Sequence, residues 1–279
     1  MAKTDDPNVD DPNDDFKHND QPEEEEEKLA EGTLVSHLVE LRSRLMKAGL
    51  AVLVVFICLV PFANRIFALV AIPLKNQLPE GATMIATGVA TPFLTPFKLT
   101  LFVALFIAIP VVLHQAWAFV APGLYRKEQK FAVPLVVSSV VLFYLGIAFA
   151  YYVVFPLMFK FFAGYAPEGV TWMTDISQYL DFILTMFLAF GIAFEVPIAT
   201  VLLVASGLVT RETLGRSRAY VFLGAFVGGM LLTPPDAISQ TLLAVPVYLL
   251  YEIGLFLSGV MVKEPWITRD DDDTAEADS

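Results

Sequence analysis

The sequence is poor in the residues that build disulfides, metal sites and catalytic centres. Its 279 residues include one cysteine and three histidines. Because Cys58 is alone, a disulfide within the chain and a cysteine-based metal site are both excluded. The histidines are His18, His37 and His114, and the sequence shows no HExxH, GxSxG or phosphate-binding loop. We therefore expect no enzymatic activity, no catalytic residue, no metal and no cofactor.

Charge is scarce in the middle of the chain and concentrated at its ends. Residues 1–31 carry 13 acidic side chains and 3 lysines, and residues 264–279 carry 7 acidic side chains and 1 arginine. Of the 30 acidic and 18 basic side chains of the protein, residues 32–263 thus keep 10 and 14. The acidic ends cannot bury enough apolar surface to offset the entropy lost on ordering. We expect two disordered, solvated tails around one apolar domain.

Long apolar runs fill that domain. Apolar residues make up 56% of the chain, which is too many for a soluble globular protein of this size. A helix needs about 20 apolar residues to cross the hydrocarbon core of a bilayer. The sequence therefore predicts an all-α polytopic membrane protein with six transmembrane helices. The expected spans lie at about residues 48–65, 94–120, 131–157, 178–204, 219–232 and 237–260.

The basic side chains near the span ends predict the orientation of the chain. On one side of the membrane only Arg65, Lys75, Lys98 and Lys160 are expected. The other side has a clear excess, which is typical of cytoplasmic loops. Both termini are therefore expected in the cytoplasm, as an even number of spans requires. The basic residues of that side are Arg42, Arg44, Lys47, Arg126, Lys127, Lys130, Arg211, Arg216, Arg218, Lys263 and Arg269.

Two spans carry informative signals at their ends. Asp175 precedes the fourth span and is suited to cap the first turn of that helix. The fifth span is short: the apolar run that starts at Tyr220 rises about 20 Å, against a hydrocarbon core of about 30 Å. This mismatch predicts local thinning of the bilayer or shelter by a partner protein.

One acidic residue lies well inside a predicted span. Glu195 follows Phe194 and precedes Pro197 in the fourth span. An acid at the centre of a membrane helix costs about 2.5–3.5 kcal/mol on insertion scales and is a functional candidate by default. Alternatively, Glu195 is a protonated structural residue, because Pro197 leaves the carbonyl group of Ala193 without its helical donor. A proton-coupled transporter of small solutes would also carry such a buried acid.

Two further acids, Glu40 and Glu128, flank the expected cytoplasmic side of the first three spans. Glu40 precedes Arg44 by one helical turn, so a surface ion pair is one interpretation. Glu128 lies at the expected start of the third span, where a helix dipole favours an acid. The functional alternative is a site for guanidinium groups, because a carboxylate accepts two parallel N–H bonds from an arginine. Two such carboxylates could bind two adjacent arginines.

Seven short strings occur in order along these spans. They are His37-Leu-x-Glu-Leu-Arg42, Met84-Ile-Ala-Thr, Gln115-x-Trp-Ala-Phe119, Ala121-Pro-x-Leu-Tyr125, Phe143-Tyr-x-Gly146, Phe194-Glu-Val-Pro197 and Leu231-Leu-Thr-Pro-Pro-Asp236. Any one of them is a weak signal. Together, from about Leu34 to Val260, they resemble the TatC family, the largest core subunit of the twin-arginine protein translocase. The resemblance implies a cupped bundle of six helices in which helices five and six are short.

The resemblance also implies a binding site. In TatC proteins the cytoplasmic N-terminal segment and the first cytoplasmic loop bind the consecutive arginines of export signal peptides. Glu128 is then expected to contact the arginines directly, with Glu40 as its helper, and Phe119 to pack on the apolar part of the signal. The same site is expected to include Arg42, Leu124, Tyr125 and Arg126.

Partners and energy source follow from the same resemblance. Single-span TatA- and TatB-type subunits are expected to dock along helices five and six, around Met230, Leu231, Thr233 and Gln240. Other copies of TatC and membrane lipid are further expected partners, whereas nucleic acid is not. Folded proteins would be exported across a bacterial inner membrane by the proton motive force. Glu195 would lie at membrane depth on the concave face, and the outer-loop residues Pro73 and Asp236 match positions important to the family.

Other functions fit the sequence less well. Small-solute transporters usually consist of two repeated halves, but spans one to three share no visible similarity with spans four to six. A purely structural membrane scaffold would leave the pair of cytoplasmic acids unexplained. The sequence thus predicts a translocase receptor, with a proton-coupled transporter that uses Glu195 as the alternative.

Overall fold

The chain divides into two units, Met1–Lys47 and Ala48–Ser279. The computed structural model describes residues 21–75, 83–120, 129–164, 173–232 and 237–261. In the first unit the described residues belong to helix α1 (Gln21–Leu59), which ends in the second unit. The helix begins inside the segment 1–31 that charge alone marks as a tail. The Glu, Lys, Leu and Ala residues at 23–30 explain this, because all are good helix formers.

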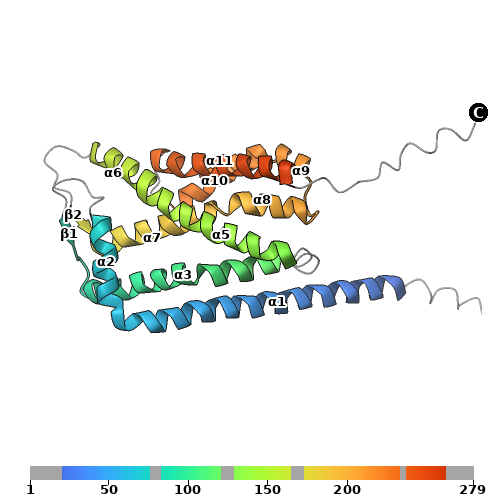
Figure 1. Cartoon of the computed structure of the whole chain (residues 1–279), viewed down its shortest axis with the longest axis horizontal. Coiled ribbons are helices and arrows are strands. Elements are labelled where there is room, and N and C mark those ends of the chain that lie inside the picture. Colours follow the sequence, from blue (N-terminus) through green and yellow to red (C-terminus); the bar gives the residue numbers. More distant parts are fainter. Residues whose placement is uncertain (1–20, 76–82, 121–128, 165–172, 233–236, 262–279) are drawn as a thin grey trace, which may run out of the picture. The chain divides into compact units, whose positions relative to one another are not determined.

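Helices also dominate the described part of the second unit (Figure 1). Among the described residues, five helical stretches are long and apolar enough to cross a membrane. The predicted helical membrane protein is thereby confirmed, and the sixth crossing stays a prediction that rests on the shorter α10. The helices after α1 are α2 (Ala63–Lys75), α3 (Thr91–Val120), α5 (Gln129–Phe149), α6 (Phe155–Gly164), α7 (Ile176–Ala193), α8 (Val196–Ala205), α9 (Arg211–Arg216), α10 (Arg218–Leu232) and α11 (Ala237–Met261).

The first apolar stretch is longer than expected and is interrupted. It runs from Leu38 to Val70, whereas the expected span was 48–65. One turn of 3₁₀-helix, η1 (Val60–Phe62), separates α1 from α2 and has a proline in its first turn. Pro73, expected in a loop, lies in the last turn of α2. The loop expectation was wrong because residues 63–72 continue as an apolar helix before the prolines and glycine that follow.

The third stretch contains a π-helical turn, η2 (Ala150–Val154), between α5 and α6. A π-helix holds one extra residue per turn and shifts the face that each half of the helix presents. Pro156, in the first turn of α6, has no backbone N–H to donate to the preceding turn. The proline thus favours a local rearrangement of the helix at this position.

Two short strands join distant parts of the chain, and sequence reasoning did not find them. Strand β1 (Thr83–Ile85) pairs in parallel with β2 (Met173–Asp175), with Met84 opposite Thr174. Asp175 then caps α7, because its side chain accepts hydrogen bonds from the backbone N–H groups of Ser177 and Gln178. The expected helix cap is therefore confirmed.

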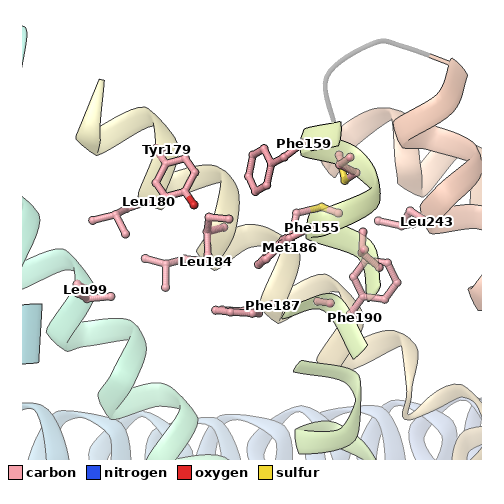
Figure 2. Packing of buried hydrophobic residues seen from close by; sticks show 14 of the residues in the cluster. Leu99, Phe155, Phe159, Tyr179, Leu180, Leu184, Met186, Phe187, Phe190 and Leu243 are labelled. Atoms are coloured by element: carbon pink, nitrogen blue, oxygen red, sulfur yellow. The ribbon is translucent and has the colours of Figure 1, made fainter. Parts of the chain in front are cut away.

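Helix α7 supplies seven of the fifteen buried residues of the larger core cluster. The same cluster includes buried residues of α3, η2, α6 and α11, and Figure 2 shows Leu99, Phe155, Phe159 and Leu243 among them. The ring centroids of Phe155 and Phe187 lie 5.3 Å apart. A second cluster joins α3, α5 and α8 through Ile109, Leu113, Trp117, Phe143, Ile198 and Leu202. In a membrane such contacts stabilise mainly by van der Waals packing, because lipid tails are as apolar as the side chains.

Candidate functional site

Three buried polar side chains form a hydrogen-bonded chain across the second unit. The indole N–H of Trp117 on α3 donates to Ser139 Oγ on α5 over 2.7 Å. The Ser139 hydroxyl donates in turn to Oε2 of Glu195. Their exposed fractions are 8%, 0% and 7%. This polar chain therefore links α3, α5 and the junction of α7 with α8 inside the packed protein.

Glu195 lies where the fourth apolar stretch is broken into α7 and α8. Helix α7 ends at Ala193 and α8 begins at Val196, with Glu195 at the N-cap position between them. The backbone N–H of Glu195 donates to the carbonyl of Ile192 over 3.0 Å, which is a tighter turn than in an α-helix. Pro197 contributes no N–H to the ladder. This break fixes where the carboxyl group leaves the helix.

Two glycines allow α5 and α7 to approach closely enough for the Ser139–Glu195 contact. A Cβ atom on Gly146 would lie closer than 3.0 Å to the carbonyl oxygen of Phe190. A Cβ atom on Gly191 would lie 2.6 Å from the ring of Phe143. Positions 139, 143 and 146 follow one another at helical spacing, so they share one face of α5. The same face thus provides the close approach and the hydroxyl group.

The two carboxyl oxygens of Glu195 differ in their hydrogen bonding. Among the described residues, Oε1 is buried without a hydrogen-bond partner. Ser139 has a single hydroxyl hydrogen, which Oε2 receives, and an indole N–H can only donate. An unsatisfied buried polar atom costs about 1–3 kcal/mol. The site therefore holds one carboxyl oxygen in a fixed position and leaves the other with unused bonding capacity.

The first unit contains the expected ion pair of Glu40. Arg44 donates to Glu40 Oε1 from Nη2 over 2.6 Å and from Nε over 2.9 Å. Arg42, two residues away, is exposed. A partly exposed ion pair of this kind contributes only about 0–1 kcal/mol.

The rest of the expected signal site is described only in part. Phe119 lies in the last turn of α3 and is half-buried. The segment between α3 and α5 lies outside the described residues, and with it Leu124, Tyr125, Arg126 and Glu128. For this part of the expected site, the structure describes only the end of α3 and the start of α5 on either side of the segment.

Helices α10 and α11 pack side by side (Figure 1), and one of the expected docking residues takes part. The Gln240 side-chain amide donates to the carbonyl of Phe226 over 2.7 Å. Met230 and Leu231 remain open to the surroundings, with exposed fractions of 56% and 79%. Thr233 and Asp236 lie outside the described residues.

Two ion pairs join helices that are distant in sequence. Arg218 at the start of α10 holds both carboxylate oxygens of Glu252 on α11, over 2.8 and 3.0 Å. Lys98 on α3 pairs with Asp181 on α7. Each pair connects two helices through partly exposed side chains. Sequence reasoning assigned no role to Glu252 or Asp181.

Asp175 ties the segment after β1 to the start of α7. Its Oδ2 accepts hydrogen bonds from the Thr87 hydroxyl over 2.5 Å and from the Thr87 backbone N–H over 2.9 Å. These bonds, with those from Gln178 and Ser177, lower the pKa of Asp175 to about 2. The carboxylate is thus charged at neutral pH and serves as a bridge between the segment after β1 and the start of α7.

Comparison with known proteins identifies the family. The model described as "Sec-independent protein translocase protein (TatC)" matches residues 36–246. A relative of that name from Azotobacter chroococcum mcd 1 is 65% identical over 80% of this chain and 88% of its own length. The chain belongs to the TatC family. A TatC from Escherichia coli K12 is 56% identical over 81% of this chain and 87% of the relative.

Solved TatC structures agree with this assignment. A crystal structure titled "Crystal Structure of Twin Arginine Translocase Receptor- TatC" matches with a TM-score of 0.71 and 38% identity. The match covers 80% of this chain and 98% of that one. A second TatC structure, solved in the detergent DDM, has the same TM-score and 37% identity. The resemblance to TatC found in the sequence is thereby confirmed.

Sequence reasoning located the buried acid of this TatC-family protein and missed the residues that hold it. Glu195 was found because an acid is rare in an apolar span. Ser139 and Ser138 are also polar residues in such a span, and this signal could have pointed to a cross-helix hydrogen bond. Nothing in the sequence indicated which of the two faces Glu195. Trp117 lies in one of the family strings, but its partner on α5 is visible only in the fold.

Proposed function

We propose that this TatC-family protein is the signal receptor of a twin-arginine translocase. The observation that carries the proposal is the match to a protein titled as such a receptor, over 98% of its chain. Signal peptides with two consecutive arginines would bind at the cytoplasmic face of this protein. In this proposal Glu128 contacts the arginines, Glu40 assists, and Phe119 packs on the apolar part of the signal.

The chemistry of this site favours arginine over lysine. A planar guanidinium group donates two parallel N–H bonds to one carboxylate, whereas an ammonium group acts as a point charge. The neighbouring Arg42 and Arg126 disfavour a cationic ligand in general, so recognition depends on directed hydrogen bonds. Leu124 and Tyr125 are further proposed members of the same site. The signal arginines would exchange with Arg44 at Glu40.

Peptide binding to the full chain in detergent tests this proposal. We expect a peptide with two consecutive arginines to bind, and its double lysine analogue to bind at least about tenfold more weakly, since one lost bidentate contact is worth about 1.4 kcal/mol or more. Glu128→Gln and Glu40→Gln should weaken binding. Glu212→Gln serves as the matched control, because Glu212 is an exposed acid in the first turn of α9. Equal binding of both peptides, or equal losses in all three variants, would contradict the proposal.

Assembly with other subunits would occur at the open side of α10. We propose that single-span TatA- and TatB-type subunits dock around Met230, Leu231, Thr233 and Gln240. Other copies of this chain and lipid would complete the complex, and folded proteins would be exported with the proton motive force. Pro73, in the last turn of α2, and Asp236 are proposed to contribute to assembly. No observation favours the alternative of a small-solute transporter, and family membership speaks against it.

The short α10 has a proposed role in transport. Its 15 residues rise about 22 Å, well below the roughly 30 Å of a hydrocarbon core. The mismatch would thin the bilayer where the single-span subunits gather. Insertion of four leucines after Leu223 should impair export of a folded reporter and leave peptide binding intact. Normal export by the lengthened protein would remove this idea.

The proposed topology has six crossings in a bacterial inner membrane, with both termini in the cytoplasm. A cysteine-free protein, Cys58→Ala, allows single cysteines to be placed at Ala2, Ala82 and Ser279. A membrane-impermeant maleimide should label the Ala82→Cys protein in intact spheroplasts. The two terminal cysteines should react only after lysis. Labelling of either terminus in intact spheroplasts would contradict the topology.

A further inference from the structure

We infer that Trp117 and Ser139 are positioning residues that couple the signal-binding segment to Glu195. The inference rests on the proposed signal-binding function. It deepens that function, because it assigns the buried polar chain a part in signal recognition. Trp117 and Ser139 are too deeply buried to contact an arginine themselves, so they would act through the helices that carry the site.

The polar chain joins the two helices that flank the segment. Helix α3 ends at Val120 and α5 begins at Gln129, so the expected signal residues Leu124 to Glu128 lie between them. Trp117 lies three residues before the end of α3, and Ser139 lies ten residues into α5. Their hydrogen bond therefore ties the last turn of α3, which leads into this segment, to the middle of α5. Phe119, on the same last turn as Trp117, is a described residue of the proposed site.

The far end of the chain is held firmly. Glu195 lies in the break between α7 and α8, and the backbone turn on either side of it is hydrogen-bonded. Close contacts at Gly146 and Gly191 prevent α5 from moving freely along α7. Trp117 itself belongs to the second core cluster, which includes Ile198 and Leu202 of α8. A shift of the α3 end relative to α5 would therefore alter the polar chain, because the chain runs from Trp117 through Ser139 to Glu195.

The direction of the hydrogen bonds makes the coupling specific. The indole N–H can only donate, so Ser139 Oγ accepts from Trp117 and gives its single hydrogen to Glu195. Hydrogen bonds in such a chain polarise one another, so loss of the first weakens the second. A signal that moves the α3 end would alter the bond at Glu195, whose Oε1 is already unpaired among the described residues. Coupling of this kind is reciprocal: removal of the Ser139 hydroxyl must also change the affinity for the signal.

Affinity measurements test the reciprocal effect. The probe is a far-red-labelled peptide with two consecutive arginines, titrated onto the full chain in detergent. We expect Ser139→Ala to weaken binding on the order of fivefold, the lower end of typical coupling between sites. Glu195→Gln keeps an oxygen that accepts from Ser139 and should bind within about twofold of wild type. Ser138→Ala is the matched control, because the Ser138 hydroxyl is exposed and donates to the Leu135 carbonyl of its own helix. Equal affinity of the Ser139→Ala and Ser138→Ala proteins overturns the inference.

Tryptophan emission tests the same coupling in a protein whose polar chain is intact. The chain has three tryptophans, so Trp172→Phe with Trp266→Phe leaves Trp117 as the sole fluorophore. We expect the arginine peptide to shift the Trp117 emission maximum, and Ser139→Ala to reduce that shift at saturating peptide. Peptide binding without any change in emission overturns the coupling and leaves the proposed receptor function standing. If the fluorescence anisotropy of the labelled peptide in the same sample shows no binding, both the coupling and the proposed receptor function are overturned.

Discussion

Glycines have opposite surroundings in two parts of this protein. At the crossing of α5 and α7, Gly146 and Gly191 lie so close to the neighbouring helix that a methyl group has no room. On α10, within the described residues, a Cβ atom on Gly224 or Gly228 would meet nothing within 4 Å. At the α5–α7 crossing, residues of the chain itself thus leave no room for a further side-chain atom. The α10 side presents small residues and large apolar side chains to its surroundings.

The difference separates a fixed part from an open part. The α5–α7 crossing holds Ser139 against Glu195, so the packed side positions a polar chain that a membrane would otherwise disfavour. Helix α10 is short and exposes Leu231, and its contact with α11 depends in part on a single side-chain hydrogen bond from Gln240. The packed side forms a rigid frame, and the α10 side is the surface at which we propose that single-span partners dock.

The largest effect is expected from a methyl group at the packed crossing. Gly146→Ala places a Cβ atom against the backbone oxygen of Phe190, which cannot rotate away. Overpacking of this kind destabilises by about 3 kcal/mol. Thermal unfolding in detergent should show a clear drop for this variant. Gly228→Ala is the matched control and should be neutral or stabilising by up to about 1 kcal/mol, because alanine is the better helix former. Similar midpoints for the two variants would remove the distinction between the two sides.

Crosslinking tests the open side directly. Leu231 on α10 and Tyr152 in η2 are similarly exposed, at 79% and 74%. A photoreactive amino acid at Leu231 should form adducts with a single-span subunit, and the same group at Tyr152 should react mainly with lipid. The comparison holds exposure constant and varies only the side of the protein. Equal adducts at both positions, or adducts at Tyr152 alone, would place the docking surface elsewhere.

A smaller effect is expected at the α10–α11 contact. Gln240→Leu removes the hydrogen bond to the Phe226 carbonyl and keeps a side chain of similar size. The expected loss of stability is on the order of 1 kcal/mol, as is found for hydrogen bonds between membrane helices. Thr241→Val is the control, because Thr241 donates to the Ala237 carbonyl of its own helix. The two unfolding midpoints, measured side by side, should differ; coincident values would show that the bond does not brace α10.

The smallest effect on stability is expected for Asp175, the cap of α7, and it depends on pH. Hydrogen bonds from Thr87 lower the pKa of Asp175 to about 2, below the value of about 3.9 expected for the unfolded chain. The lowered pKa means that the contribution of Asp175 to stability is complete above about pH 4 and is lost as the pH falls toward 2. The difference in melting temperature between wild type and Asp175→Asn should therefore shrink from pH 6 to pH 3. Parallel melting curves over this range would exclude Asp175 as the titrating group.

Much of the packed side could be anticipated from the sequence, because its signals are local. An acid before an apolar run predicted the Asp175 cap, and an acid inside a run marked Glu195. The partners of Glu195 could not be predicted in the same way. The helices concerned are apolar on nearly every face, so periodicity does not show which face of α5 meets α7. That choice depends on the contacts at Gly146 and Gly191, which bring residues about 45 positions apart together.

Short strands and interrupted helices were the other features that could not be predicted from the sequence. The strands β1 and β2 are three residues each, too short for an alternating pattern to stand out from a loop. The π-helical turn between α5 and α6 and the interruption before α2 depend on local proline geometry within otherwise apolar runs. Positions of this kind determine where a side chain points, and a hydropathy pattern reports only that a helix is present.

Export in living cells tests the central claim most directly. The protein would be produced with its own single-span partners in a bacterium that lacks a TatC, together with a folded fluorescent reporter behind a twin-arginine signal. The account predicts that the reporter reaches the periplasm, and that export stops when the two arginines become lysines or when a protonophore collapses the proton motive force. Export that continues with the lysine signal, or no export by a complex that assembles normally, would contradict the assignment of this protein as a twin-arginine signal receptor.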